Sequence, residues 1–128
     1  KIQTKVGDIL DDEVPDKFTI SDKMWTSAIR RKENNRKRGY GFGFSLFDKE
    51  SEYTSTISAR YYKDGSEIWI DQEAKNPRML TPNEARKLQG FPEGFQIPVS
   101  NLQAYKQFGN SVSVPVIRAI AERIIKLL

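Results

Sequence analysis

The C-terminal segment, residues 114–128, carries an apolar stripe that constrains the fold more than any other feature of the sequence. Proline at position 115 suits the first turn of a helix, because an N–H there would have no intrahelical partner. Apolar residues then recur at helical spacing and form one wide face: Val116, Ile117, Ile120, Ala121, Ile124, Ile125 and Leu128. We therefore expect a buried terminal helix that docks in part onto a body outside this chain.

Length and composition fit one compact domain, or a smaller domain with an appended segment. The chain has no cysteine and no histidine, which excludes disulfides and thiolate metal sites and removes the commonest general base. An independent catalyst is therefore not expected, nor is a metal. No apolar run approaches the roughly 20 residues of a membrane helix, and the start does not resemble a secretory signal. We expect an intracellular protein without a membrane partner.

Positive charge is concentrated between residues 30 and 38. Six basic residues and the single acidic Glu33 give this stretch a charge of +5, so the rest of the chain, whose total is +4, carries −1. Such a patch is typical of a protein that binds polyanions, although a solvated helix face gives the same pattern. The basic residues are Arg30, Arg31, Lys32, Arg36, Lys37 and Arg38.

A helix is expected over residues 22–37, because Ser21 offers an N-cap, apolar residues follow at helical spacing, and Gly39 can end it. Its second half is almost wholly polar and should project into solvent or towards a partner. Residues 39–44 then alternate glycine with aromatic residues. These aromatics could stack against bases, or they could fill the core from a pleated strand, which is the interpretation we favour.

A β-hairpin is expected from strands 54–62 and 67–71 around Asp64-Gly65, a two-residue turn of the primed type. This register predicts one buried face made of Ile57, Ala59, Tyr61, Ile68 and Ile70. Arg60, Tyr62 and Trp69 would lie on the other face. There Arg60 could form a cation–π pair with Trp69, or it could contact a base edge.

A short helix is expected after Thr81, where the N-cap threonine, Pro82 at the first helical position and Glu84 form a capping box. Gly90 would end this helix after about two turns. Residues 97–101, which include a proline, are interpreted as a connector.

Two blocks of the sequence resemble the last two motifs of the DNA cytosine-5 methyltransferases. The first is Arg78-x-Leu80-Thr81-Pro82-x-Glu84-Ala85-x-x-Leu88-Gln89-Gly90-Phe91-Pro92, and the second is Gln103-Ala104-Tyr105-Lys106-Gln107-Phe108-Gly109-Asn110-Ser111-Val112. The resemblance covers roughly residues 39–128. It implies a cytoplasmic, bacterial restriction-modification enzyme that transfers a methyl group from S-adenosylmethionine to C5 of a flipped cytosine in a short specific sequence of double-stranded DNA.

That family's nucleophile is a cysteine in a Pro-Cys motif, which this chain lacks. The resemblance therefore implies the C-terminal part of a methyltransferase, as a fragment or a subunit, inactive without a catalytic domain that carries the Pro-Cys motif. Residues 1–20 would connect to that domain, 21–95 would form the target-recognition domain, and 96–128 would belong to the catalytic domain.

The expected fold class is α+β: a small mixed domain with a hairpin-containing twisted sheet and flanking helices, plus a C-terminal helix that would complete a Rossmann-like catalytic domain. By the resemblance, the positions lining the methyl-donor pocket are Gly109, Asn110, Ser111 and Val112. They would bind S-adenosylmethionine together with the missing catalytic domain, and no metal is implied. Taken alone, Gly-Asn-Ser would be an ordinary turn.

The resemblance also assigns DNA contacts. Thr56 matches the threonine of the family's Thr-Leu pair, with Ile57 in place of the leucine, and the segment that follows occupies the place of a recognition loop. We expect Arg60 to read a base and Lys63 to contact phosphate, with Tyr62 beside them. The basic residues of the 30–38 stretch would track phosphates. The alternatives are a non-catalytic, sequence-specific DNA-binding module and a protein-interaction domain that docks through its terminal helix.

Overall fold

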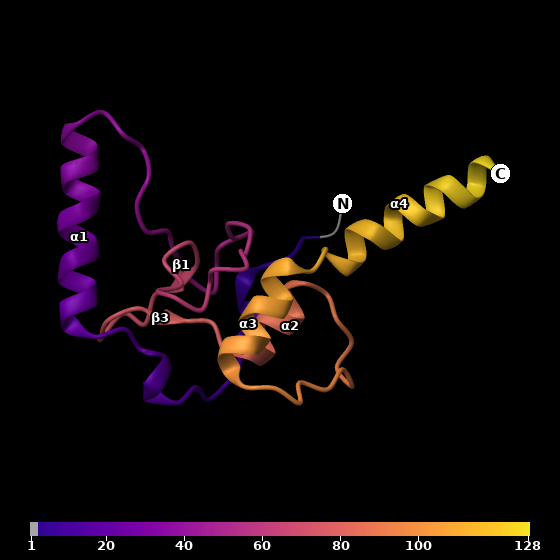
Figure 1. Ribbon diagram of the computed structural model, residues 1–128, viewed down its shortest axis with the longest axis horizontal. Coiled ribbons are helices and arrows are strands. Elements are labelled where there is room, and N and C mark those ends of the chain that lie inside the picture. The colour runs from indigo at the N-terminus through magenta and orange to yellow at the C-terminus, as the bar shows by residue number, and fades with distance from the viewer. Residues whose placement is uncertain (1–2) are drawn as a thin grey trace.

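The computed structural model describes residues 3–128 and shows an α+β chain in which helices flank a small sheet, so the predicted fold class is confirmed. The first two residues of the predicted connector 1–20 lie outside the described residues. The elements are two short 3-10 helices (Val6–Asp8 and Asp16–Phe18), α1 (Asp22–Lys37), β1 (Leu46–Phe47), β2 (Trp69–Ile70), β3 (Arg78–Met79), α2 (Pro82–Leu88), α3 (Asn101–Asn110) and α4 (Val114–Leu127). Figure 1 shows α1 and α4 at opposite ends of the molecule, with the sheet, α2 and α3 between them.

Three two-residue strands form the sheet, in the order β1-β2-β3. β1 runs parallel to β2, with Leu46 opposite Trp69, and β2 runs antiparallel to β3, with Trp69 opposite Met79. The backbone N–H of Trp69 also donates to the carbonyl of Ser45 at 3.0 Å. Both edges of β2 are therefore occupied.

The predicted hairpin around Asp64-Gly65 is wrong. Residues 54–58 have no regular secondary structure, and residues 59–64 form successive turns. The N–H of Lys63, for example, donates to the carbonyl of Arg60 at 3.0 Å, a local bond where a ladder bond was expected. The physical reason is competition for β2, because β1 and β3 already satisfy the backbone groups on both of its edges.

Burial follows the predicted pattern in part. Four of the five residues expected on the inner face are buried: Ile57, Tyr61, Ile68 and Ile70. Ala59 is only half-buried. Trp69, predicted on the outer face, is buried, because β2 is covered on both faces. Arg60 is exposed and forms no cation–π pair with Trp69, so this alternative for Arg60 is wrong and the contact to a base edge stays a prediction.

Two buried tyrosines, Tyr61 in the 57–68 segment and Tyr105 on α3, bond to the backbone of Leu80 just before α2. The hydroxyl of Tyr61 donates to the carbonyl of Ile68 at 2.6 Å and accepts from the N–H of Leu80 at 2.8 Å. The hydroxyl of Tyr105 donates to the carbonyl of Leu80. Burial raises the pKa of both tyrosines above its ordinary value, so both hydroxyls remain protonated donors.

The long helix α1 begins and ends where the sequence predicts. Ser21 is its N-cap, and the hydroxyl oxygen accepts from the N–H of Met24 at 3.2 Å. Gly39 follows the C-cap with φ of 81°, the left-handed conformation that glycine adopts without strain. The polar second half of α1 is mostly exposed, as expected.

The predicted capping box of α2 is present, but α3 was not predicted. Thr81 accepts from the N–H of Glu84 at 3.1 Å, and Glu84 accepts from the N–H of Thr81 at 2.7 Å. Residues 97–101 were interpreted only as a connector, yet α3 begins at the end of that range with Ser100 as its N-cap. The signal was available in the sequence, because Ser100 precedes apolar residues at helical spacing.

The core has two adjoining parts. The main cluster lies between α2, α3 and the 57–70 segment and contains Ile57, Tyr61, Ile68, Ile70, Leu80, Ala85, Ala104, Tyr105 and Phe108, with Val6 from the connector. A smaller cluster under α1 holds Ile20, Ala28 and Trp69, against which Trp25 and Phe44 pack. Because Trp69 stands on β2, the sheet joins α1 to the main core.

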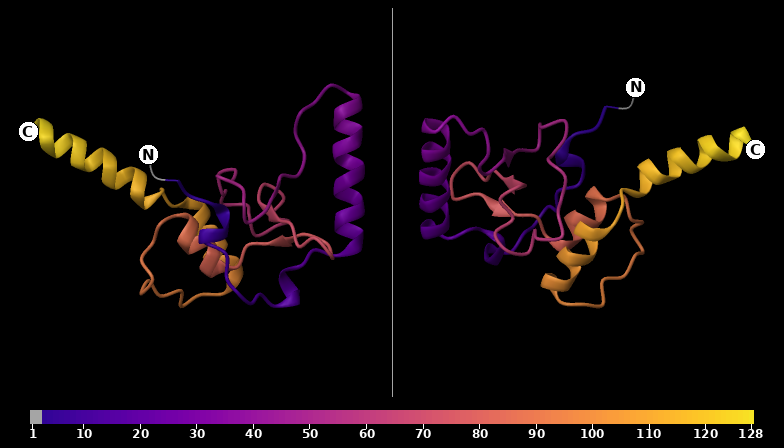
Figure 2. Two further views of the ribbon diagram at one scale, coloured as in Figure 1. Left: turned by 180° about the vertical axis from the view of Figure 1, so that it is seen from behind. Right: turned by 45° about the horizontal axis from the view of Figure 1, so that its top comes forward.

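The terminal helix α4 has the predicted start and the predicted stripe, but none of its residues is buried. In all three views of Figures 1 and 2, α4 projects away from the rest of the molecule. Its root is fixed, since the N–H of Val114 donates to the carbonyl of Gln89 at 2.9 Å. The burial expected for the stripe is not supplied by this chain.

No helix in the described part of the chain has both the length and the apolar character needed to cross a membrane.

Candidate functional site

The basic patch lies on α1 and its C-terminal cap, and all six of its cationic side chains are exposed. Two of them have intramolecular partners. Arg36 donates to Glu33 at 2.8 Å, which lowers the pKa of that carboxyl and raises the pKa of the guanidinium. Lys32 donates to the carbonyl of Phe44 at 3.2 Å, and its ammonium lies 4.2 Å from the centre of the Phe44 ring. The side chains of the other four form neither a salt bridge nor a hydrogen bond within residues 3–128: Arg30, Arg31, Lys37 and Arg38.

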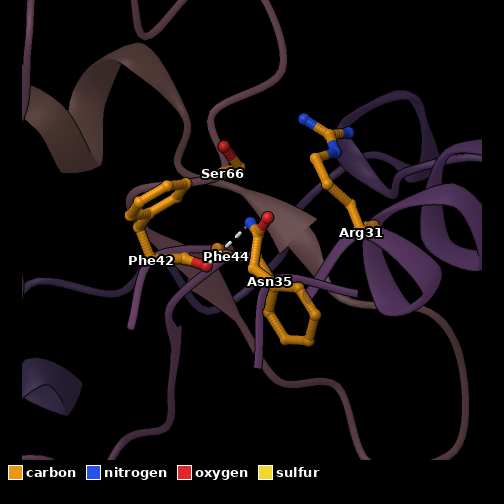
Figure 3. A pocket seen from close by; sticks show the side chains of 7 residues that line it. Arg31, Asn35, Phe42, Phe44 and Ser66 are labelled. Atoms are coloured by element: carbon orange, nitrogen blue, oxygen red, sulfur yellow. Dashed lines mark hydrogen bonds between the residues drawn. The ribbon is translucent and has the colours of Figure 1, made fainter. Parts of the chain in front are cut away.

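The glycine-aromatic segment 39–44 is a loop beside α1, and the core interpretation is wrong for two of its aromatics. Tyr40 and Phe42 are 51% and 66% exposed and stack on each other, with ring centres 5.2 Å apart. Only Phe44 packs in the core. The reason is that the loop pairs with α1: the side-chain amide of Asn35 donates to the carbonyl of Phe42 at 3.1 Å (Figure 3).

The turn that carries Arg60 is held by side-chain hydrogen bonds. The carboxylate of Glu67 accepts from the hydroxyl of Ser58 at 2.8 Å and from its N–H at 3.3 Å. The hydroxyl of Ser58 in turn accepts from the N–H of Arg60 at 3.3 Å. A fixed backbone with an exposed arginine suits a contact to an external group.

The other predicted DNA contacts on this segment differ in exposure. Thr56 and Lys63 are exposed. Tyr62 is half-buried against the main core, and the ammonium of Lys106 lies 4.9 Å from the centre of its ring. One face of Tyr62 is therefore already covered by its own chain.

Residues 109–112 form the end of α3 and the link to α4. The hydroxyl of Ser111 donates to the carbonyl of Phe108 at 2.7 Å, and the side-chain amide of Gln89 donates to the same carbonyl at 2.8 Å. Asn110 and Val112 are exposed, and the Asn110 side chain makes no hydrogen bond within the described range. The backbone at the end of α3 is thus fixed by hydrogen bonds to the Phe108 carbonyl, and the polar side chain of Asn110 is exposed.

Gly109 brings this motif into contact with the Arg60 turn. A Cβ atom built on Gly109 would lie 2.5 Å from the backbone nitrogen of Ala59 and would also overlap the carbonyl of Ser58. The resemblance places this glycine in the lining of the methyl-donor pocket. In the structure it lets the 58–59 backbone pack directly on α3, and its role towards a donor stays a prediction.

The polar groups at the end of α3 are compatible with the amino-acid end of S-adenosylmethionine. The free Asn110 amide offers donors and an acceptor, and the Ser111 hydroxyl keeps acceptor capacity after its bond to Phe108. Asn110 is exposed and Ser111 is half-buried, so both side chains can be reached from outside the chain. Across residues 3–128, no cluster of three or more acidic side chains is arranged to hold a metal.

A buried ion pair holds the connector against the first motif. Arg78 donates to both carboxylate oxygens of Glu84, at 2.8 and 2.9 Å, and both side chains are almost fully buried. Glu84 also accepts from the N–H of Asp11 at 2.9 Å. Asp11 in turn accepts from Thr81 at 2.7 Å and from Lys87 at 3.1 Å. Glu84, Thr81 and Lys87 of the first motif block therefore hold the connector in place at Asp11.

The sequence interpretation missed Gln89, Ser58 and Glu67. Gln89 is buried and bonds both to the end of α3 and, through its carbonyl, to the start of α4. Its place in the first motif block was a signal that it matters. Ser58 and Glu67 carried no such signal, because their contact depends on the turns that replaced the expected hairpin.

Comparison with protein families matches residues 1–126 to a family described as C-5 cytosine-specific DNA methylase. The chain is 63% identical over 126 residues to Type II methyltransferase M1.ScrFI of Lactococcus lactis subsp. cremoris, a match that covers 98% of this chain and 32% of that protein. It is 67% identical over 120 residues to Type II methyltransferase M.NlaX of Neisseria lactamica, which covers 94% of this chain and 38% of that protein. The chain thus spans about a third of the length of these relatives.

Solved structures agree with the fold. The chain superposes on Entamoeba histolytica methyltransferase EhMeth with a TM-score of 0.71 and 26% identity, covering 95% of this chain and 40% of the other. The match to S. pombe Dnmt2 methyltransferase has a TM-score of 0.78 over 96% of this chain and 42% of the other, at 15% identity, and supports the fold alone.

Proposed function

The chain belongs to the C-5 cytosine-specific DNA methylase family, and we propose that it is the target-recognition and donor-pocket-completing part of a DNA (cytosine-5-)-methyltransferase. The complete enzyme would transfer a methyl group to C5 of a flipped cytosine within a short, specific sequence. The nucleophile must be a thiolate on a second domain or subunit, because this chain contains no cysteine. The chain alone is expected to be inactive.

The uncovered stripe of α4 carries the proposal. Ile117, Ile120 and Ile124 are between 45% and 53% exposed, and no residue of the helix is buried. Exposed apolar surface of this extent indicates a docking face. Because the chain spans only about a third of its relatives' length, the occupant we infer is the catalytic domain, which the rest of such a protein would supply.

The positions of α1 and α4 support separate surfaces for binding DNA and for docking the catalytic domain. Figure 1 shows the two helices at opposite ends of the molecule. One end carries the cations that remain free to bind phosphate, and the other carries the apolar stripe. One surface can therefore hold DNA while the other docks the catalytic domain.

The DNA contacts divide by role. Arg30, Arg31, Lys37 and Arg38 are free to track phosphates, whereas Lys32 and Arg36 contribute through their positive potential, since each already has a partner. Arg60 stands on a held turn and is the proposed base reader. Thr56 and Lys63 flank it as proposed backbone contacts, and Tyr62 supports the turn from the core side.

The proposed donor contacts lie at the end of α3. When bound, S-adenosylmethionine supplies the methyl group. Asn110 and Ser111 would hydrogen-bond its polar amino-acid end, while Gly109 and Val112 shape the link between α3 and α4. Because α4 begins two residues after Val112, docking of the stripe would also set the position of this link.

The experiment is reconstitution. The chain is mixed with the N-terminal two-thirds of M1.ScrFI or M.NlaX, and transfer of labelled methyl from S-adenosylmethionine to DNA is measured. Activity is expected only in the mixture. Ile120→Glu on the stripe should abolish association and activity, because it places a charge in an apolar interface. Arg118→Gln, on the polar side of α4, makes the same change in charge and should preserve both.

Stable association without any methyl transfer would refute the enzyme part of the proposal. Sequence-specific DNA binding that is unaffected by either companion, with no association, would instead indicate the non-catalytic DNA-binding module.

A further inference from the structure

A cavity of about 420 Å³ lies between α1 and the glycine-aromatic loop. This volume is within the range of about 300–1,000 Å³ typical of small-ligand sites. Figure 3 shows Arg31 and Asn35 reaching it from α1, with Phe42 and Ser66 on the facing segments. The lining combines an aromatic ring, a cation and an amide, which are the groups that recognise a nucleobase.

The aromatic wall is built to remain exposed. Phe42 stacks on Tyr40 with an angle of 15° between the rings, the offset arrangement that aromatic pairs favour. The backbone of this loop is tied to Asn35 at two points, the carbonyl of Phe42 and the N–H of Tyr40. Gly43 lets the loop approach the aliphatic part of Lys32, where a Cβ atom would lie 3.0 Å from the nearest carbon. The backbone that carries the exposed rings is therefore anchored to α1.

The polar wall can still bind a ligand. Asn35 uses its side-chain nitrogen to hold Phe42, and its side-chain oxygen remains available to accept a hydrogen bond from a base amino group. Arg31 forms no salt bridge within residues 3–128, and it also lines a second hollow of about 380 Å³ together with Arg30 and Arg38. A cavity that takes an aromatic group thus adjoins a surface suited to phosphates.

We propose that the Arg31–Asn35–Phe42 cavity is a base-stacking site for DNA. An unstacked base lies on the exposed face of Phe42, Asn35 accepts from its edge, and Arg31 binds the adjacent phosphate. This inference rests on the proposed function, since the ligand is a base of the same DNA. It adds to that proposal a second recognition point, separate in sequence from the Arg60 turn.

The experiment compares two single-stranded oligonucleotides of equal length and charge, one with normal bases and one abasic throughout. Affinity of the full chain for each is measured by fluorescence anisotropy over a series of salt concentrations. The wild-type chain should prefer the base-bearing strand by about 5- to 100-fold, as expected for stacking on an aromatic side chain. Phe42→Leu should remove most of this preference without changing the salt dependence, because no charge is lost.

Three variants separate stacking from charge and from general surface effects. Phe42→Trp should keep the base preference. Arg31→Ala should weaken binding to both strands and reduce the salt slope by about 0.7, the loss of one phosphate contact on a single strand. Tyr53→Leu is the control, since Tyr53 is 78% exposed and lines a different hollow near the root of α4, and it should bind as the wild type does.

The inference fails if the wild-type chain binds both strands equally, or if Phe42→Leu retains the preference. Circular dichroism checks that Phe42→Leu is folded. If Phe42→Leu unfolds, Phe42→Trp is used in its place, and loss of the base preference in a folded Phe42→Trp would contradict the inference. Equal binding of both strands by a chain that still reconstitutes methyl transfer would overturn this inference alone. Absence of any salt-dependent DNA binding would overturn the proposed function as well.

Discussion

Gln89 and Phe108 are joined by a buried hydrogen bond of 2.8 Å, from the side-chain amide of Gln89 to the carbonyl near the end of α3. The carbonyl of Gln89 accepts from the N–H of Val114, the first residue of α4. One residue of the first motif therefore holds both ends of the 109–112 segment. The two motifs act as one structural unit, although ten residues separate them in the sequence.

Replacement of Gln89 by Met should loosen this segment. The change keeps the volume but leaves the carbonyl of Phe108 with the Ser111 hydroxyl as its remaining side-chain donor, at a cost of about 1–2 kcal/mol in the free energy of unfolding. In the reconstituted enzyme the KM for S-adenosylmethionine should rise more than kcat falls. Urea unfolding and steady-state kinetics measure the two effects, and an unchanged KM would contradict the proposed role of residues 109–112.

Gly109→Ala should destabilise the chain by at least about 1–3 kcal/mol, because the new methyl group would overlap the backbone of Ser58 and Ala59, which cannot move aside cheaply. The control is Gly94→Ala, where no atom lies within 4 Å of the added Cβ and the change should be almost neutral. Thermal and urea unfolding of both variants provide the measurement. Equal stability of the two variants would show that the 58–59 segment does not pack on α3.

Arg78→Met should cost about 3–5 kcal/mol of unfolding free energy, because it leaves the buried carboxylate of Glu84 without its cation. Arg36→Ala removes a cation from the exposed pair with Glu33 and should leave the stability almost unchanged, because solvent screens that pair. Urea unfolding at neutral pH compares the two. If Arg78→Met changed the free energy of unfolding only slightly, the Arg78–Glu84 pair would have to be in contact with water in solution.

Asp11 should make stability depend on pH in the acid range. Burial alone would raise its pKa, but hydrogen bonds from Thr81, Asn83 and Lys87 together lower the pKa below its ordinary 3.8. The carboxylate therefore stabilises the fold above about pH 4, and this contribution is lost as the pH falls through the lowered pKa. Asp11→Asn should cost about 1–2 kcal/mol at pH 7. The unfolding free energies of the wild-type chain and of Asp11→Asn, measured by urea unfolding at several pH values, should converge as the pH falls. A difference in stability that does not change with pH would rule out the Asp11 carboxylate as its source.

Arg60→Ala and Lys37→Ala should affect DNA binding differently. Loss of Arg60 should relax base preference at one position of the target by about 1–3 kcal/mol. Loss of Lys37 should weaken binding to specific and random DNA equally and reduce the salt slope on duplex DNA by about 1. Binding titrations of the reconstituted protein on specific and random duplexes test this. Identical behaviour of the two variants would refute the division into base and phosphate contacts.

The sequence predicted helices better than strands, for a reason visible in particular residues. Ser21, Gly39, Thr81 and Gly90 act on backbone groups a few positions away, so the boundaries of α1 and α2 could be read locally. The hairpin prediction depended on which segment pairs with β2. That choice was made by β1, which lies more than twenty residues before β2 and carries no strong strand signal.

The candidate site shows the same limit. The two motif blocks identified residues 109–112, and the charge pattern identified the basic stretch on α1. The sequence could not show that Lys32 and Arg36 already have partners, that Tyr40 and Phe42 remain exposed, or that Gly109 packs against Ser58. Each of these contacts joins side chains or backbone that only the folded chain brings together.

By itself, the sequence determined the ends of α1 and α2, the amphipathic stripe of α4, the location of positive charge and the family, because capping, periodicity, net charge and motif spacing are properties of neighbouring residues. The tertiary structure alone decided which cations are free, which aromatic rings are exposed and how the two motifs are joined through Gln89. Those properties depend on competition between distant segments for the same hydrogen-bonding partners and the same buried space.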